Sequence, residues 1–181
     1  PAASACFNSP VDIPNFPNDF AFQLENAEAD GITFTIQKSG TAAQGGGGGA
    51  LGYAGIAKSV AIKFDLYSNN GEGDDSTGIY QNGASPDAPF IDLSNSGIDL
   101  HTGDTFSVHM TYNGATLAMS ITDGFTGAVY NHRWSITIPQ VNGRNTASVG
   151  LTAVTGGHTA SHKLQPWSFL GAGGSVRAPA P

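Results

Sequence analysis

Charged side chains, cysteine and long apolar runs are all scarce in this chain of 181 residues. Only 7 residues are Lys or Arg, against 14 Asp or Glu, so the formal net charge is −7. Nucleic-acid phosphates and anionic membrane surfaces both attract basic faces, and this composition argues against both partners. No apolar run approaches the length of a membrane span, which argues against membrane insertion.

Cys6 is the single cysteine, so an internal disulfide is excluded. Pairing with another chain stays open, although an unpaired thiol without a role is the simpler interpretation. The chain opens with Pro1 and shows no signal peptide, as a processed protein or a fragment would. Few Lys, with many Gly, Ser, Thr and Asn, favour a secreted, extracellular or cell-surface protein of bacterial type.

Apolar and polar residues alternate along most of the chain with a period of two, which indicates strands rather than helices. Phe20, Phe22 and Leu24 form the first such run, and Asn113-Gly114 is a typical hairpin turn between two later runs. We expect about nine or ten short strands in an all-β antiparallel sandwich. Other predicted strands lie within residues 32–36, 60–66, 106–112, 117–121, 134–138, 149–153 and 164–169.

The length suits one domain with a sizeable core, and we assign residues 1–170 to it. From Gly171 the sequence has no apolar period, so residues 171–181 are predicted to be a Gly- and Pro-rich tail or linker. Five consecutive glycines, residues 45–49, form another irregular segment, which is flexible unless a neighbour holds it.

Carboxylates gather in the stretch AIKFDLYSNNGEGDDSTG, which begins as a strand and ends as a polar loop. Asp65 and Tyr67 point to one face of the strand, Asn69 follows, and a glycine turn swings Asp74 or Asp75 back toward Asp65. Calcium prefers such oxygen ligands, but the spacing is not that of an EF-hand loop. Taken alone, the stretch fits a solvated acidic loop better than a calcium site.

Four motifs, in this order, resemble those of the L-type (legume-type) lectin family. They are ADG at a strand start, the loop GGGGGALG, the strand VAIKFDLYSNN with its acidic loop, and the closing pair VGLTAVTG and PWSF. The resemblance covers roughly residues 20–170 and suggests a bacterial-like member that lacks the family's first strands. It implies a jelly-roll, concanavalin-type sandwich that binds carbohydrate without catalysis.

The resemblance also implies a calcium ion beside the sugar site. The implied ligands are Asp65, the backbone carbonyl of Tyr67, Asn69 and Asp75, with Asp74 as the alternative to Asp75. The family's second, transition-metal site has a glutamate where this chain has Lys63, which argues against manganese. We therefore expect calcium without a transition metal, and the Lys63 ammonium is a candidate for the second metal's space.

The implied sugar site combines polar groups with an aromatic ring, which complement the hydroxyls and the C–H face of a neutral sugar. By resemblance, Asp30 accepts hydrogen bonds from sugar hydroxyls, and Tyr67 offers its ring face. The other implied contacts are the glycine-loop N–H groups, an amide and the rim of the last loop: Gly48, Gly49, Asn69, Gly157 and His158. The family's Ala-Asp peptide bond is cis, and we expect the same of Ala29-Asp30.

An enzymatic role finds little support in the sequence. No Gly-x-Ser-x-Gly elbow is present. Glu25, Glu28 and Glu72 do not form the paired-carboxylate run of similar-looking glycosidases. The alternative to glycan binding is a structural subunit of an extracellular assembly or filament, self-associating through the sheet edge that the missing first strands leave open.

Overall fold

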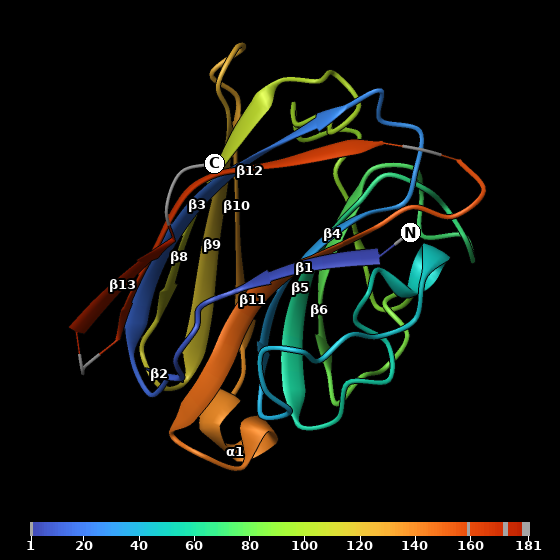
Figure 1. Ribbon diagram of the computed structural model, residues 1–181. Helices are drawn as coiled ribbons and strands as arrows, with labels where there is room; N and C mark the ends of the chain where they lie inside the picture. Colours follow the sequence, from blue (N-terminus) through green and yellow to red (C-terminus); the bar gives the residue numbers. More distant parts are fainter. Residues whose placement is uncertain (1, 159, 172–173, 179–181) are drawn as a thin grey trace.

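The computed structural model describes residues 2–158, 160–171 and 174–178. They form two antiparallel sheets that face each other as the layers of a sandwich (Figure 1). The seven-stranded sheet has the order β1-β11-β4-β5-β6-β7, with β2 also paired to β11. The six-stranded sheet has the order β10-β9-β8-β3-β12-β13. The all-β sandwich predicted from the period-two pattern is confirmed.

The strands of the seven-stranded sheet are β1 (Ala2–Cys6), β2 (Val11–Asp12), β4 (Gly31–Gln37), β5 (Ser59–Asp65), β6 (Ser76–Gln81), β7 (Ile91–Asp92) and β11 (Thr146–Val154). Those of the six-stranded sheet are β3 (Phe16–Glu25), β8 (Thr105–Tyr112), β9 (Thr116–Asp123), β10 (Val129–Ser135), β12 (Ser161–Gly171) and β13 (Gly174–Ala178). The helical elements are a 3-10 turn, η1 (Gly48–Ala50), and α1 (Ile138–Asn142). No helix in the described part of the chain is long and apolar enough to cross a membrane.

The two sheets bury their facing side chains in one apolar core. On β3, Phe20 and Phe22 are buried while their neighbours in sequence are only partly buried or exposed, as the period of two predicts. Phe20 stacks on Phe34 of β4 with ring centroids 5.8 Å apart, and Phe22 meets Phe64 of β5 at 5.2 Å. These contacts between the sheets position β4 and β5, from whose ends the loops of the candidate site begin.

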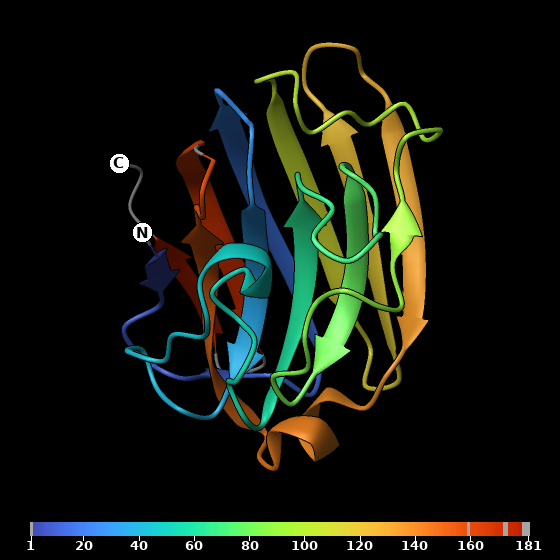
Figure 2. The same cartoon turned by 90° about the vertical axis from the view of Figure 1, so that its right-hand side faces the viewer.

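β4 and β5 are buried on both faces. One face joins the core, and residues 45–56 cover the other (Figure 2). Tyr53 is fully buried in this outer layer and packs with Ala61 of β5. The Thr152 hydroxyl of β11 donates to the Leu51 carbonyl at 2.7 Å. The five consecutive glycines therefore belong to a segment that the sheet holds in place.

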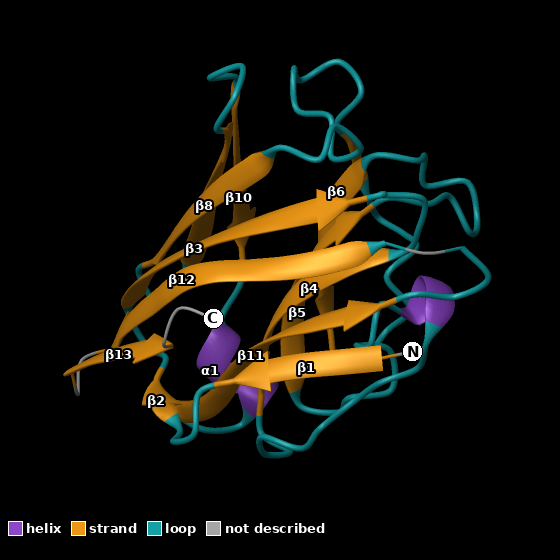
Figure 3. Cartoon of the chain, turned by 45° about the horizontal axis from the view of Figure 1, so that its top comes forward, coloured by secondary structure: helices purple, strands orange, loops and turns teal. Residues whose placement is uncertain are grey.

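Strand β1 lies along the edge of the seven-stranded sheet (Figure 3). Ala2 is opposite Val154 of β11, and Cys6 is opposite Gly150. The sheet edge that the sequence predicted to be open beside β11 is therefore occupied by residues of the same chain. The Cys6 sulfur packs so closely on Gly150 that a side chain there would overlap it.

The segment after Gly171, predicted to be a tail or linker, contains strand β13. It pairs with β12 so that Ala178 is opposite Trp167. Backbone hydrogen bonds to an edge strand require no apolar period, and the pattern therefore did not reveal this strand. Residues 172–173 and 179–181 of the predicted tail lie outside the described residues.

The predicted strand over residues 134–138 is only half correct. β10 ends at Ser135, and Ile138 begins the short helix α1. Pro139 lacks the backbone N–H that a sheet ladder needs, and its fixed φ suits the first turn of a helix. Ile138 is still fully buried, so its apolar side chain reaches the core from a helix instead of a strand.

His162 of β12 provides a test of stability against pH. Its Nε2 atom is buried without a hydrogen-bond partner in the described residues, and burial lowers the pKa of His162 from its usual 6.5. The folded protein therefore binds this proton less tightly than the unfolded chain, so stability falls as the pH drops below about 6.5. We expect His162→Gln to reduce this acid destabilisation in urea unfolding near pH 7.5 and near pH 5. The exposed His109, changed to Gln, serves as the control, and an unchanged pH difference in the His162 variant would contradict the prediction.

Candidate functional site

Antiparallel pairing brings several predicted site residues to one end of the seven-stranded sheet. Gly31, the first residue of β4, is opposite Asp65 at the end of β5 and Val154 at the end of β11. The loops that precede β4, follow β5 and follow β11 therefore meet there. Together with η1 they carry the residues assigned to sugar binding: Asp30, Gly48, Gly49, Tyr67, Asn69, Gly157 and His158.

Asp30 stands at the centre of these loops and is only 4% exposed. The peptide bond before it is cis, as the sequence predicted. Its backbone N–H donates to the Val154 carbonyl at 3.3 Å, and its carbonyl accepts from the Leu66 N–H at 2.7 Å. The carboxylate oxygen Oδ2 has no hydrogen-bond partner among the residues described. The backbone thus holds a carboxylate with an acceptor still free.

Gly156, in the last loop that the resemblance assigns to the rim of the sugar site, lies directly beside this carboxylate. A Cβ added at Gly156 would be 3.0 Å from Asp30 Oδ2 and 3.5 Å from the Gly48 Cα. Burial raises the pKa of Asp30, while the N–H of Gly156 and the nearby His158 oppose the rise. The rim loop, which is the segment 155–158 after β11, therefore approaches both η1 and Asp30 closely.

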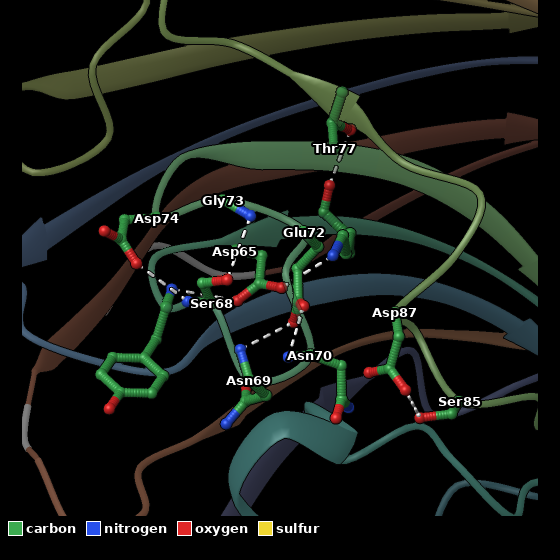
Figure 4. Close-up of polar contacts among 12 residues, drawn as sticks. Asp65, Ser68, Asn69, Asn70, Glu72, Gly73, Asp74, Thr77, Ser85 and Asp87 are labelled. Atoms are coloured by element: carbon green, nitrogen blue, oxygen red, sulfur yellow. Dashed lines mark hydrogen bonds and ion pairs between the residues drawn. The ribbon is translucent and has the colours of Figure 1, made fainter.

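The Asn69 side chain points toward η1 (Figure 4). It lies so close to Gly49 that a Cβ on that glycine would overlap the Asn69 amide group. The structure thus places two of the predicted sugar contacts, Gly49 and Asn69, against each other, although 20 positions separate them in the sequence.

An aromatic surface borders the same space. Tyr67 is 36% exposed, and its ring stacks on the imidazole of His158 with centroids 5.6 Å apart. His158 Nδ1 lies 3.7 Å from the Glu28 carboxylate, and Gly157 before it is exposed. The rim loop therefore presents a ring face and a backbone edge beside Asp30.

The acidic loop between β5 and β6 is held by its own side chains (Figure 4). Glu72 is 1% exposed and accepts the N–H groups of Asn69 at 3.1 Å and Asn70 at 2.7 Å. The exposed Asp74 accepts the Ser68 N–H at 3.1 Å. Glu72 received no role from the sequence, because nothing in a glycine-flanked glutamate indicates that it folds inward.

Asp65 forms an ion pair with Lys63 in the protein interior. Lys63 Nζ donates to Asp65 Oδ2 at 2.8 Å, and the two side chains are 0% and 1% exposed. The Tyr67 N–H donates to the other carboxylate oxygen at 3.3 Å. Burial raises the pKa of Asp65 to about 6, with Lys63 and the Tyr67 N–H opposing the rise and Glu72 adding to it.

Asp75 belongs to a different group of side chains. Burial and the neighbouring Asp99 raise the pKa of Asp75 to about 7, with His101 opposing the rise and Asp92 adding a little. Its Oδ1 atom is buried and lacks a partner within the described ranges. Asp75 therefore interacts electrostatically with Asp92, Asp99 and His101 of the segment 92–101.

The predicted calcium ligands contact different parts of the protein. Asp65 already uses both carboxylate oxygens, Asn69 points to η1, and Asp74 is exposed. In residues 2–158, 160–171 and 174–178, no three His, Cys, Asp or Glu side chains gather in an arrangement that would hold a metal ion. Lys63 already compensates the Asp65 charge, and calcium binding by the predicted set stays a prediction.

His101 joins two loops of the site, a role that the sequence did not reveal. Its Nδ1 lies 2.8 Å from the Ala27 carbonyl and its Nε2 lies 2.6 Å from the Asp74 carbonyl. Carbonyls only accept hydrogen bonds, so an imidazole with both nitrogens protonated satisfies both. Burial disfavours that charged form, but the two hydrogen bonds, Asp99 and Asp75 raise the pKa of His101 overall. These partners are 74 and 27 positions away, and no local motif predicts the contacts.

A two-sheet sandwich with these loops at one end has counterparts among known proteins. The family model of the legume lectin domain matches residues 7–179. The chain belongs to the legume lectin family. A lectin from Leucomphalos mildbraedii is 27% identical to this legume lectin over an alignment of 172 residues, and the match covers 87% of this chain and 69% of the relative. The family predicted from the four motifs is confirmed.

Solved structures of legume lectins share the fold. A basic winged bean lectin with Tn-antigen has a TM-score of 0.80 at 21% identity, covering 98% of this chain and 81% of that one. Peanut lectin with a 9mer peptide has a TM-score of 0.78 at 22% identity, covering 99% and 82%. Members of the family are non-catalytic carbohydrate-binding proteins, so the prediction that this lectin is not an enzyme is also confirmed.

Proposed function

We propose that this legume lectin binds a neutral sugar residue in the space between Asp30, η1 and the rim loop. The strongest support is the buried Asp30 carboxylate with its unpartnered Oδ2 atom. A sugar hydroxyl supplies the missing donor, while the Asn69 amide and the N–H groups of Gly48 and Gly49 pair with adjacent hydroxyls. The Tyr67 ring then covers the apolar C–H face of the sugar.

The rim loop is proposed to set specificity. Gly157 and His158 are exposed beside Tyr67, and the shape of this loop decides which sugar substituents fit. Galactose-type sugars are the first to test, because structures similar to this chain are described with methyl-α-D-galactose and with GalNAc.

Calorimetric titration of the full chain with methyl-α-D-galactoside and GalNAc tests the proposal, followed by a glycan array for other sugars. We expect saturable binding of at least one sugar in buffer with saturating calcium. A protein that melts cooperatively but binds no glycan under these conditions would overturn the proposed function.

Calcium dependence is the finer prediction made from the sequence. A calcium ion that ordered the loops in advance would raise sugar affinity, and excess chelator would lower it. Comparing the sugar affinity measured in EDTA with that measured in calcium tests whether sugar binding depends on calcium. Lys63 and Glu72 already hold the acidic loop, which favours sugar binding that survives the chelator.

Gly49→Ala is expected to weaken sugar binding about tenfold, equivalent to about 1.4 kcal/mol. The added methyl group overlaps the Asn69 amide and displaces it from the site. Gly47→Ala is a matched control in the same loop, because a Cβ there meets no atom within 4 Å. Titration of both variants checks the effect, and equal affinities would show that the position of Asn69 does not matter.

We also propose an extracellular location, on the strength of composition alone: few Lys and Arg among many small polar residues. Immunodetection in culture medium and cell fractions tests this location, and retention inside the cells would contradict it.

The structural-subunit alternative depended on an open sheet edge. Since β1 occupies that edge beside β11, we do not propose it.

A further inference from the structure

We infer that the Lys63 ammonium supplies, from within the chain, the positive charge that orders the sugar-binding loop, so that the loop and its sugar binding need no metal ion. The inference concerns the acidic loop between β5 and β6 and rests on the proposed sugar site. It departs from the family pattern, in which metal ions are generally bound.

Lys63 is an unusual cation because it is completely buried. A buried ammonium persists only when it is paired. Here Nζ donates to Asp65 Oδ2 at 2.8 Å and lies 5.8 Å from the centre of the Tyr80 ring, whose face attracts positive charge. Lys63 therefore supplies a cation to the buried Asp65 carboxylate from within the chain.

Asp65 also makes a second contact, which connects it to the sugar-binding loop. With Oδ2 held by Lys63, the other oxygen accepts the backbone N–H of Tyr67 at 3.3 Å. This bond fixes the start of the loop and the direction in which the Tyr67 side chain leaves it. Lys63 thus positions a sugar-contacting residue without itself reaching the sugar.

Glu72 fixes the other half of the loop. Its two carboxylate oxygens accept the N–H groups of Asn69 and Asn70, at 3.1 and 2.7 Å. Because the backbone of Asn69 satisfies Glu72, the Asn69 amide remains free to lie against Gly49. Hydrogen bonds within the loop therefore stabilise the buried Glu72 carboxylate without a metal ion.

A divalent ion would also be disfavoured beside Asp65. It would meet the Lys63 ammonium at close range, and like charges in a poorly hydrated interior repel strongly. The remaining predicted ligands do not offset this repulsion, because Asp75 faces Asp99 and His101 and Asp74 binds the Ser68 N–H.

The first experiment uses the full chain after dialysis against EDTA. We expect its melting temperature to change by less than about 1 °C on addition of millimolar Ca²⁺ or Mn²⁺, because an ion that bound only the folded state would raise it. Sugar affinity in EDTA should lie within about twofold of that in calcium. A rise of several degrees with either ion, or loss of sugar binding in EDTA, would overturn the inference.

Hydrogen exchange of the loop separates this inference from the proposed function. Amides in residues 66–75 should be equally protected in EDTA and in calcium, and lower protection in EDTA would overturn the inference even if no sugar were bound. Absence of sugar binding in both buffers, with equal protection, would instead count against the proposed function alone.

Lys63→Glu exchanges the internal cation for a carboxylate and tests the same idea in reverse. We expect this variant to melt several degrees higher with Ca²⁺ or Mn²⁺ than in EDTA. Lys38→Glu, on the exposed surface, makes the same charge change and should not respond to either ion. A Lys63→Glu variant that melts at the same temperature in EDTA and in metal would show that Lys63 does not stand in for a cation.

Discussion

Asp30→Asn should reduce sugar affinity by at least about a hundredfold while the protein remains folded. The carboxylate is held by its backbone contacts and offers the unpartnered Oδ2 to a sugar hydroxyl. A hydrogen bond to a charged group contributes about 1.5–3 kcal/mol, and the upper end of this range corresponds to about a hundredfold in affinity. The amide also presents an N–H₂ donor where the site needs an acceptor.

The measurement is calorimetric titration of the variant beside the wild-type protein, with the melting temperature recorded for both. Asp19→Asn is the matched control, because Asp19 is an exposed carboxylate on β3 of the other sheet. The melting temperature of Asp30→Asn should not fall, since the amide avoids burying a charge. An Asp30→Asn variant that binds sugar as tightly as the wild type would remove Asp30 from the site.

Lys63→Met should destabilise the protein by about 3–5 kcal/mol at pH 8, the usual cost of leaving one member of a buried ion pair without its partner. Methionine fills similar space but leaves the Asp65 carboxylate charged and 1% exposed. The expected loss exceeds that of most surface changes, which lie within about 0.5 kcal/mol. Urea unfolding measures the loss in unfolding free energy of Lys63→Met, and Lys38→Met, at an exposed lysine, is the control.

The loss should also depend on pH. Burial already raises the pKa of Asp65 to about 6, and removing Lys63 takes away the positive charge that opposes this rise most strongly. A carboxyl group whose pKa is raised on folding favours the folded state at low pH and loses that contribution as the pH rises through the folded pKa. The Lys63→Met deficit should therefore be smaller near pH 5 than near pH 8.

The double variant Lys63→Met, Asp65→Asn controls for the lost packing of the lysine. Without a buried charge, it should recover part of the stability that the single variant loses. Asp65→Asn alone is measured for comparison. If the losses in unfolding free energy of the two single variants simply add up in the double variant, the two side chains act independently.

The apolar period and the ordered motifs were sufficient to predict the sandwich and the family, and the motifs name residues that meet at the candidate sugar site. Phe20 and Phe22 face the core because side chains alternate along a strand, which is a local property of the chain. The motifs assign Asp30, Gly49 and Asn69 to one site, and the structure places Gly49 against Asn69. Antiparallel pairing explains why the loops that carry Asp30 and Asn69 meet, because it places both loops at one end of the sheet.

The sequence by itself determined the fold class and which residues surround the candidate sugar site, because both depend on short-range patterns. Only the tertiary structure decided how the charges are paired. Whether Asp75 turns to Asp65 or to Asp99, and whether Glu72 folds inward, depends on contacts between distant segments and on burial. The same holds for His101, which links carbonyls of two loops far from it in sequence. Charged side chains pair with residues that are distant in the sequence. The sequence therefore shows where the acidic loop lies, but only the tertiary structure shows that Lys63 compensates the charge of Asp65.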